Sequence, residues 1–525
     1  MFDLAIRSGT IIDGKGSKPY RADVYVSNGK IACISTSDEK HPAREAIDAS
    51  EQIISPGFID SHSHDDFVFG SDPYNTPKLT QGVTTVIVGN CGMGTAVAPQ
   101  DSACLYEYES GVIGKNPLQP PTAFSHYLTY LQEALPAMNV GILVGHIPLR
   151  VAITGFASRP LTLPEIQKLE DLASECIGQG ALGLSTGLMY QPIYHAKTQE
   201  LVALGRVASR SKSILTFHMR DYSANLTKAL EEVCHVAQIS AAKVQVSHLR
   251  AGGKSNRGKP RKAIEFIATA IQDGIDIGFD DYPYTAGASL LSQILPQWLI
   301  DGGTGQALER LKDSGIRRQA LDELNGLSSS ISVLSEAGAN NILILGVRTQ
   351  VNKKFEGMTI SDIANRANSD PAEILLRLYE EEEGHISIAA DWFAQDDVNA
   401  VIEHPLSIVI SDGIHTEGKP HPRLFGAFPK FLRNYAINGS LRLEEAIRKI
   451  TSAPANRYGL GKIGAVETGY QADFVIFDPK SLRDNATYNA PTNLAEGITY
   501  VIVNGCIVLK NGQTTRARPG RILMS

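Results

Sequence analysis

The sequence lacks the features that mark several classes of protein. It has no basic stripe, and its net charge of −7 over 525 residues is modest, so nucleic acid is not expected as a partner. No apolar run approaches the length of a membrane span. Residues 1–7 do not combine a basic region with an apolar run, so we expect no signal peptide. The six cysteines are scattered without a Cys-x-x-Cys pair, which favours reduced thiols and a cytoplasmic location.

The chain also has no strict internal repeat, no low-complexity tract and no Gly-rich dinucleotide fingerprint. Its middle part alternates apolar runs, typical of strands, with amphipathic windows, typical of helices. This alternation favours a (β/α)8 TIM-like barrel, an α/β fold, over a doubly wound sheet, for which the missing fingerprint gives no support. The predicted strands are residues 84–88, 140–144, 181–185, 213–217, 243–247, 275–279 and 406–410, and predicted helices include 163–177, 226–239 and 262–273.

Both ends of the chain have a different texture, that of short strands joined by tight turns. Asn28-Gly29 follows an alternating apolar run near the start, and Asn504-Gly505 follows another near the end. Asn-Gly in this setting is a strong hairpin signal. We therefore predict a small β-sandwich domain built from residues 1–56 and 462–525, flanking a barrel of residues 57–461.

The β-α rhythm is interrupted late in the predicted barrel. Residues 287–351 contain a charged helical segment, at residues 307–323, instead of the next strand. We interpret this stretch as an insertion after a late barrel strand. Such loops lie at the carboxyl-terminal face of a barrel, where active sites form. The insertion is thus either a substrate-selecting subdomain or a plain helical decoration.

A short stretch near the start of the barrel indicates a metal site. An apolar run after Pro56-Gly57 ends in His62-Ser63-His64. Residues two apart on a strand point to the same face, so the two imidazoles would enter one cavity. Such a pair suits a divalent transition metal such as zinc, although His-x-His alone is more often an ordinary polar pair at a strand end.

Four further strand ends carry side chains that can bind metal or move protons. Cys91 follows the second predicted strand between glycines, and His218 and His248 each end an apolar run. Asp412 follows the last predicted strand. Each of these residues alone is more often structural. Strand ends of a barrel converge on one face, however, so the combination with His62 and His64 predicts a metal centre next to a carboxylate.

At these residues the chain resembles the amidohydrolase superfamily, and within it the D-aminoacylases, or N-acyl-D-amino-acid deacylases. The resemblance runs nearly end to end, and the cysteine after the second strand is its more diagnostic part. The other matching motifs are Ser185-Thr186-Gly187-Leu188-Met189-Tyr190, His218-Met219-Arg220, Asp281-Tyr282-Pro283-Tyr284-Thr285-Ala286, Asn352-Lys353-Lys354-Phe355-Glu356-Gly357, Ser411-Asp412-Gly413 and His421-Pro422-Arg423.

The resemblance implies a role for each side chain of the predicted centre. Cys91, His218 and His248 would hold one tightly bound zinc, and His62 and His64 would form a weaker second position. Zinc lowers the pKa of water to about 7. Asp412 would take the proton of the attacking water and pass it to the leaving nitrogen. Tyr190 would donate to the scissile carbonyl as negative charge develops there.

A second set of residues would hold the carboxylate of a small-molecule N-acyl-D-amino acid. Arg250, Tyr282 and Arg423 are its predicted members, because cationic forks suit planar carboxylates. Relatives often carry Lys where this chain has Arg250. The loop at residues 145–150 departs from the pattern of the family and is a candidate wall of the acyl pocket.

Three alternatives remain open on the sequence. The same chemistry could act on a cyclic amide, as in hydantoinases, or on a dipeptide with a D-residue at its carboxyl end. A non-catalytic scaffold on the same fold is the third, but such a protein would be expected to lose metal ligands. The preferred side chain, the occupancy of the second metal position, the role of the insertion and the oligomeric state are not indicated.

Overall fold

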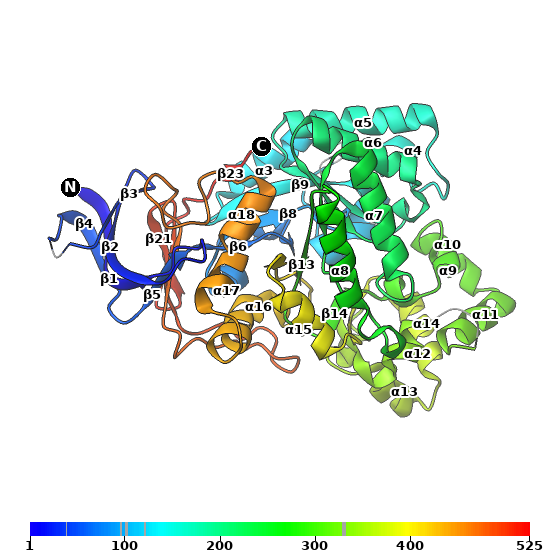
Figure 1. The fold of residues 1–525 in the computed structure, drawn as a ribbon. Coiled ribbons are helices and arrows are strands. Elements are labelled where there is room, and N and C mark those ends of the chain that lie inside the picture. The colour runs from blue at the N-terminus through cyan, green and yellow to red at the C-terminus, as the bar shows by residue number, and fades with distance from the viewer. Residues whose placement is uncertain (38, 95–96, 100–102, 120–121, 328–331) are drawn as a thin grey trace.

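The computed structural model describes residues 1–37, 39–94, 97–99, 103–119, 122–327 and 332–525. Its centre is a sheet of eight parallel strands in the order β17-β13-β12-β11-β10-β9-β8-β6 (Figure 1). Their bounds are β6 (Phe58–Asp60), β8 (Val83–Val88), β9 (Asn139–Gly145), β10 (Gly183–Gly187), β11 (Ile214–His218), β12 (Lys243–Val246), β13 (Ile277–Asp281) and β17 (Ser407–Val409). This arrangement confirms the predicted barrel.

Outer helices cover the barrel strands. In α7 (Leu226–Ser240) the side chains of Leu226, Leu230 and Val233 are buried together, because residues three and four apart share one helical face. Within β8, all six residues are buried, as expected for a parallel strand with both faces covered. The other helices around the barrel are α1 (Thr76–Leu79), α2 (Ala103–Ile113), α3 (Phe124–Ala134), α4 (His146–Thr154), α5 (Leu163–Gly178), α6 (Thr198–Arg210), α8 (Lys259–Gln272), α15 (Gln395–Glu403), α16 (Arg423–Phe431), α17 (Leu443–Lys449) and α18 (Ser452–Tyr458).

The barrel closes between its first and last strands through short extensions. β7 (Ser63–His64) pairs in parallel with β18 (Gly413–Ile414), and the Asp412 N–H donates to the His62 carbonyl at 2.9 Å. The same seam is held by the buried Lys78, whose ammonium contacts the Asp60 carboxylate and the Ser411 hydroxyl. Burial would lower the pKa of Lys78, but the neighbouring carboxylates raise it, so the side chain stays charged.

Replacing Lys78 by Met is expected to destabilise the protein by about 3–5 kcal/mol, because the buried carboxylates of Asp60 and Asp65 would lose their counter-ion. A shift of the urea midpoint would measure this loss. The matched control is Lys312→Met, which removes an ion pair on an exposed helix surface and should cost at most about 1 kcal/mol. Equal midpoints for the two variants would contradict the role of Lys78 in the seam.

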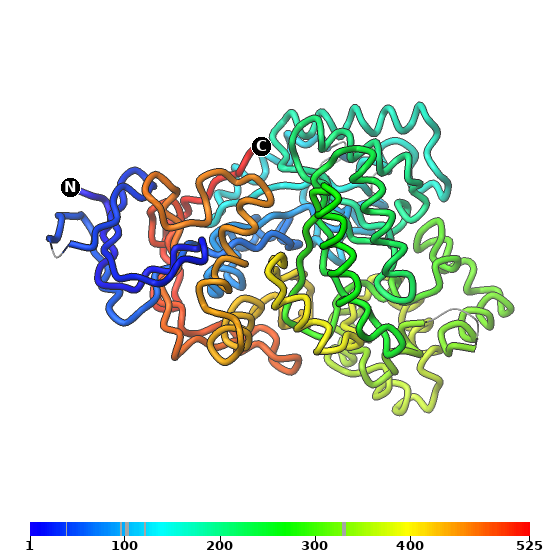
Figure 2. Tube along the Cα trace, in the orientation of Figure 1, coloured from blue at the N-terminus to red at the C-terminus, as the bar shows by residue number. Residues whose placement is uncertain are grey.

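The two ends of the chain form the small β domain. Its strands are β1 (Phe2–Ile11), β2 (Tyr20–Ser27), β3 (Lys30–Ser35), β4 (Ala43–Asp48), β5 (Ile53–Pro56), β19 (Phe474–Phe477), β20 (Ile498–Val503), β21 (Cys506–Lys510) and β22 (Gln513–Thr514). They make one sheet that closes on a shared apolar core, with β1 pairing β2, β4 and β5. Figure 2 shows the first and last parts of the chain side by side. In the predicted Asn28-Gly29 turn both residues have positive φ, 52° and 71°.

One part of the predicted β domain lies elsewhere. β23 (Ile522–Leu523), close to the end of the chain, pairs in parallel with β9 of the barrel. The predicted range 462–525 is therefore too long at its end. The last strand is only two residues long, and its partner is almost 400 positions away, so no local pattern could indicate it.

The stretch after β13 forms a separate unit with its own apolar core, seen at the lower right of Figure 1. It has an antiparallel sheet of β14 (Ala286–Leu290), β16 (Ile386–Asp391) and β15 (Ile342–Val347), with helices α9 (Gln297–Ile300), α10 (Thr304–Leu311), α11 (Ser314–Leu324), α12 (Val333–Ala337), α13 (Ile360–Ala367) and α14 (Pro371–Glu381). Because its core continues to Ala390, we place the end of the inserted unit near Asp391 rather than at the predicted residue 351.

Among the described residues, no helix combines the length and the apolar character that a bilayer crossing requires. No disulfide joins the described cysteines. The predicted cytoplasmic location stays a prediction.

Candidate metal centre and active site

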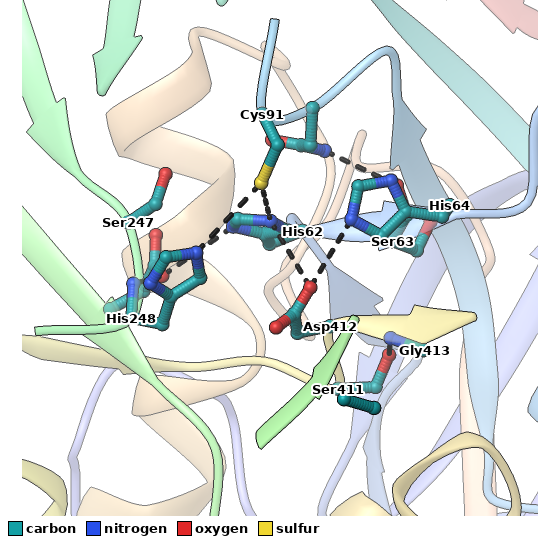
Figure 3. Close-up of polar contacts among 12 residues, drawn as sticks. His62, Ser63, His64, Cys91, Ser247, His248, Ser411, Asp412 and Gly413 are labelled. Carbon is teal, nitrogen blue, oxygen red and sulfur yellow. Dashed lines mark hydrogen bonds and ion pairs between the residues drawn. The ribbon is translucent and has the colours of Figure 1, made fainter. Parts of the chain in front are cut away.

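The strand ends bring the predicted ligands together at one mouth of the barrel. His62 and His64 follow β6, Cys91 follows β8, His218 ends β11 and His248 follows β12. Cys91 Sγ lies 3.2 Å from His62 Nε2 and 3.8 Å from His248 Nε2. Figure 3 shows the Cys91, His62, His64, His248 and Asp412 side chains pointing toward one another. The chemistry-bearing side chains of distant segments therefore share one small space.

The ligand atoms fall into two groups that have Cys91 in common. One group is Cys91, His218 and His248, and the other is Cys91, His62, His64 and Asp412. Within each group all the ligand atoms lie within 4.8 Å of one another. This is the separation expected of ligands around one ion. Cys91 is thus the residue that the two groups share.

The backbone at three of these residues adopts a left-handed conformation that L-residues seldom take. Cys91 has φ of 56°, His248 of 35° and Asp412 of 49°. Each follows a parallel strand by two or three residues. A sharp turn directly after a strand points the side chain into the barrel mouth instead of along the strand direction. The strain is thus concentrated where the site residues lie.

The charges in the cluster favour a thiolate. Burial would raise the pKa of Cys91, but the charge of the adjacent His62 and the nearby imidazoles of His218 and His248 hold it well below its ordinary value. Burial would likewise lower the pKa of His64, whereas Asp412 and Cys91 raise it to about 9. A cation that displaces the imidazolium proton would find a thiolate and imidazoles, a donor set that suits a soft or borderline metal ion such as zinc.

Ring nitrogens without partners provide a separate test of whether a metal fits. Both ring nitrogens of His218 and the Nδ1 atom of His64 are buried, with no hydrogen-bond partner among the described residues. Buried polar side-chain atoms in folded proteins nearly always have one. The unpaired His218 nitrogens lie in the group with Cys91 and His248, so these residues fit a metal ion.

Asp412 is the carboxylate of the cluster. Its Oδ1 atom lies 3.4 Å from His62 Nε2 and 3.2 Å from His64 Nε2, and its Oδ2 atom lies 2.9 Å from Arg423 Nη1. Burial would raise the pKa of Asp412, but Arg423 and His62 hold it well below its ordinary value. The side chain is therefore ionised at neutral pH.

Comparisons with known proteins bear on this site. The model of the Amidohydrolase family matches residues 357–509. The chain is 31% identical to a D-aminoacylase of Alcaligenes xylosoxydans xylosoxydans, over 99% of this chain and 97% of that protein. An N-acyl-D-glutamate deacylase of the same organism is 33% identical, over 99% and 96%.

Solved structures agree with the sequence relatives. A D-aminoacylase crystal structure superposes with a TM-score of 0.85 at 31% identity, covering all of both chains. The N-acyl-D-glutamate deacylase of Bordetella bronchiseptica, complexed with zinc and a phosphonate inhibitor, superposes at 0.84 with 32% identity and the same coverage. This chain belongs to the D-aminoacylase family of amidohydrolases. D-hydantoinase, at 14% identity and a TM-score of 0.57, shares the fold alone.

In this member of the family, the residues predicted to bind the carboxylate of the substrate lie together, but each of them contacts different groups. The Arg250 guanidinium stacks on the Tyr282 ring at 3.7 Å and bonds the Asp281 carboxylate. Arg423 stacks on the same ring at 4.4 Å, while its charge faces Asp412. Arg250 and Tyr282 line a cavity that also contains Cys91, His218 and Asp412, called the catalytic cavity below, whereas Arg423 is buried and does not line it. Tyr284 donates to the Pro422 carbonyl and is not among the lining residues.

Tyr190 also lines the cavity, close to the metal ligands. Its ring centroid lies 4.8 Å from that of His218. Burial raises the pKa of Tyr190 well above its ordinary value, so the phenol stays protonated and remains a hydrogen-bond donor.

Two residues that support the centre were missed in the sequence. Asp280 accepts from the His248 N–H at 2.7 Å and lies 3.7 Å from His62 Nδ1, so it orients both ligands. The sequence marks Asp280 only as the first of two adjacent aspartates at the end of β13, and only the second one, Asp281, belongs to a motif shared with the family. Tyr222 bridges the Met219 N–H and the Ser247 carbonyl, and it packs on the rings of two ligands.

The predicted acyl-pocket loop at residues 145–150 does not line the cavity. His146 begins α4, where it contacts Thr186 at 3.0 Å and Glu200 at 2.9 Å. Arg150 pairs with the same Glu200, so the polar side chains of this segment contact β10 and α6 and not the cavity. The unusual sequence at this point therefore serves packing of α4 against β10 and α6.

Proposed function

We propose that this chain is a zinc-dependent N-acyl-D-amino-acid deacylase, which hydrolyses the amide to a carboxylate and the free D-amino acid. The observation that carries the proposal is the meeting of Cys91, His218 and His248 with the ionised Asp412 at one barrel mouth. Cys91, His218 and His248 would hold the tight zinc, and His62 and His64 would complete a weaker second position. Zinc held there supplies Lewis acidity, lowering the pKa of water to about 7.

Asp412 moves the proton in this proposal. Its Oδ1 atom faces the ligand cluster, so it can accept a proton from the attacking water as the oxygen bonds to the carbonyl carbon. When the carbon–nitrogen bond breaks, the same proton passes to the leaving nitrogen and the carboxylate is regenerated. Arg423 positions this side chain through Oδ2, while Oδ1 is held toward the ligand cluster, where the transfer takes place.

The other lining residues orient the substrate. The Tyr190 phenol donates to the scissile carbonyl oxygen as it gains negative charge. Arg250 and Tyr282, on one side of the cavity, bind the α-carboxylate of the amino acid. Arg423, 4.4 Å from the centroid of the same ring, helps to fix the position of Tyr282. Fixing the carboxylate and the carbonyl together places one face of the amide toward the attacking water.

A hydrolysis panel on one zinc-analysed sample tests the proposal. We expect N-acetyl-D-amino acids to be cleaved at least about 100-fold faster than their L-enantiomers, because an inverted α-carbon moves the amide away when the carboxylate is held. Chelation of the zinc should abolish turnover. The panel includes a hydantoin and a dipeptide with a carboxyl-terminal D-residue, and preference for either of these would overturn the assignment. Release of the free amine is the measured quantity.

A further inference from the structure

The catalytic cavity has two chemically different sides. One side is formed by the metal-centre residues with Arg250 and Asp412. The remaining lining, here called the apolar wall, is mainly apolar and comes largely from the inserted unit and the loops that join it to the barrel. Its main residues are Val112, Met189, Ile294, Val333, Ile388 and Trp392. A substrate whose amide and carboxylate lie on the polar side must place its remaining groups against this apolar wall.

The cations near the cavity are already engaged, because Arg250 is assigned to the α-carboxylate of the substrate and Arg423 pairs with Asp412. Arg250 is the only lysine or arginine among the described lining residues, and its guanidinium bonds Asp281 and the carbonyls of Tyr284 and Tyr282. Arg423 faces Asp412. The apolar wall therefore offers no counter-ion to a second carboxylate on the substrate.

The pocket next to the apolar wall does not supply a counter-ion for a side-chain carboxylate either. It shares Met189, Gln293, Ile294, Val333 and Trp392 with the cavity and contains Arg220. Arg220, however, bonds Glu232 through both Nε and Nη2, at 3.0 and 3.1 Å. The same pocket also holds Asp221 and Glu323. Its charge balance thus opposes an anion.

We propose that the substrates are N-acyl-D-amino acids with large apolar side chains, and that acidic side chains are rejected. This inference rests on the proposed function and names its substrate class. A leucine or phenylalanine side chain would bury apolar surface against the wall, whereas a glutamate side chain would lose its hydration without gaining a partner. Identity to relatives does not decide the question, because D-aminoacylase, the D-glutamate enzyme and the D-aspartate enzyme are 31%, 33% and 32% identical to this chain.

Gln293 is the position from which this preference can be reversed. It lines both the cavity and the adjacent pocket, and both polar atoms of its amide lack a hydrogen-bond partner among the described residues. A cation placed there would face the side-chain subsite without disturbing an existing bond. Gln293 is therefore a specificity-determining residue rather than a catalytic one.

The test compares N-acetyl-D-leucine with N-acetyl-D-glutamate on the zinc-loaded protein. We expect kcat/KM to favour the leucine substrate by at least about 100-fold, the scale on which a buried unpaired polar group discriminates. Gln293→Lys should shift this ratio toward glutamate by at least about 10-fold through a new ion pair. Gln293→Met, of similar shape and without charge, should leave the ratio in favour of leucine.

Binding is measured separately from turnover. Calorimetric titration of zinc-loaded Asp412→Asn with the two intact substrates should show the same order of affinity. A wild-type ratio within threefold of unity, or one favouring glutamate, would overturn the inference while leaving the deacylase assignment intact. An unchanged ratio in a folded Gln293→Lys protein would overturn the role of Gln293. Failure to cleave any N-acyl-D-amino acid would instead remove the proposed function itself.

Discussion

Asp412→Asn is expected to lower kcat by about three to four orders of magnitude while zinc remains bound. The amide cannot accept the proton of the attacking water, and general acid–base catalysis contributes factors of this size. The tight zinc should stay, because Cys91, His218 and His248 form a group that does not include Asp412. KM should change much less than kcat, since the carboxylate contacts Arg250 and Tyr282 are untouched. Steady-state kinetics and metal analysis of the same preparation measure both quantities.

The control for this variant is Asp301→Asn, the same chemical change at a partly exposed aspartate that pairs with His195. The kcat of Asp301→Asn should equal that of the wild type. Loss of the Asp412 charge leaves Arg423 buried beside a neutral amide, so thermal unfolding must be compared as well. A folded, zinc-loaded Asp412→Asn protein with kcat within tenfold of the wild type would refute its role as the proton acceptor.

The residues that meet at the centre could be predicted, because in a barrel the place of a residue relative to its strand determines at which face of the barrel it lies. An apolar run places the residue after it at the carboxyl-terminal face, whichever strand it ends. His62, Cys91, His218, His248 and Asp412 each follow such a run, so their convergence required only the fold. The roles of these residues came from the resemblance to the family, and they stay proposals.

The residues that support the centre could not be predicted, because their signals are long-range. Lys78 lies in a short helix with no motif. It becomes a seam residue only because Asp60 of the first barrel strand and Ser411, after the last one, both lie next to its ammonium group. The pairing of Arg423 with Asp412 similarly depends on the position of α16. Sequence patterns identify side chains at element ends, but not which charges will neutralise each other.

The end of the inserted unit was misplaced for a related reason. The run that forms β16 is apolar and buried, as a barrel strand would be. It pairs instead with β14 and β15 in an antiparallel sheet, and its partners in β14 are about 100 residues away in the sequence. The apolar side of the catalytic cavity, and hence the expected substrate class, depends on where this sheet lies.

Cys91→Ala is expected to remove the tightly bound zinc and activity together. Cys91 is the one residue common to both ligand groups, so its loss leaves two imidazoles at the tight position. Loss of a ligand from such a site weakens affinity severely, because zinc sites use three or four protein ligands. We expect zinc content in the dialysed protein to fall below about one tenth of the wild-type value, the scale on which even outer-shell changes weaken metal binding. Turnover should fall in proportion to the lost zinc.

Two further measurements separate metal loss from unfolding. Cys506→Ser alters an exposed thiol in the β domain and should keep its zinc. Wild-type protein titrated with cobalt should show the charge-transfer absorption of a thiolate ligand, and Cys91→Ala should lack it even at saturating cobalt. The thiolate is expected at neutral pH because the neighbouring His62 lowers the pKa of Cys91 against the effect of burial. Full zinc content in Cys91→Ala would place the metal at other residues, and the chemistry assigned to Asp412 would lose its basis.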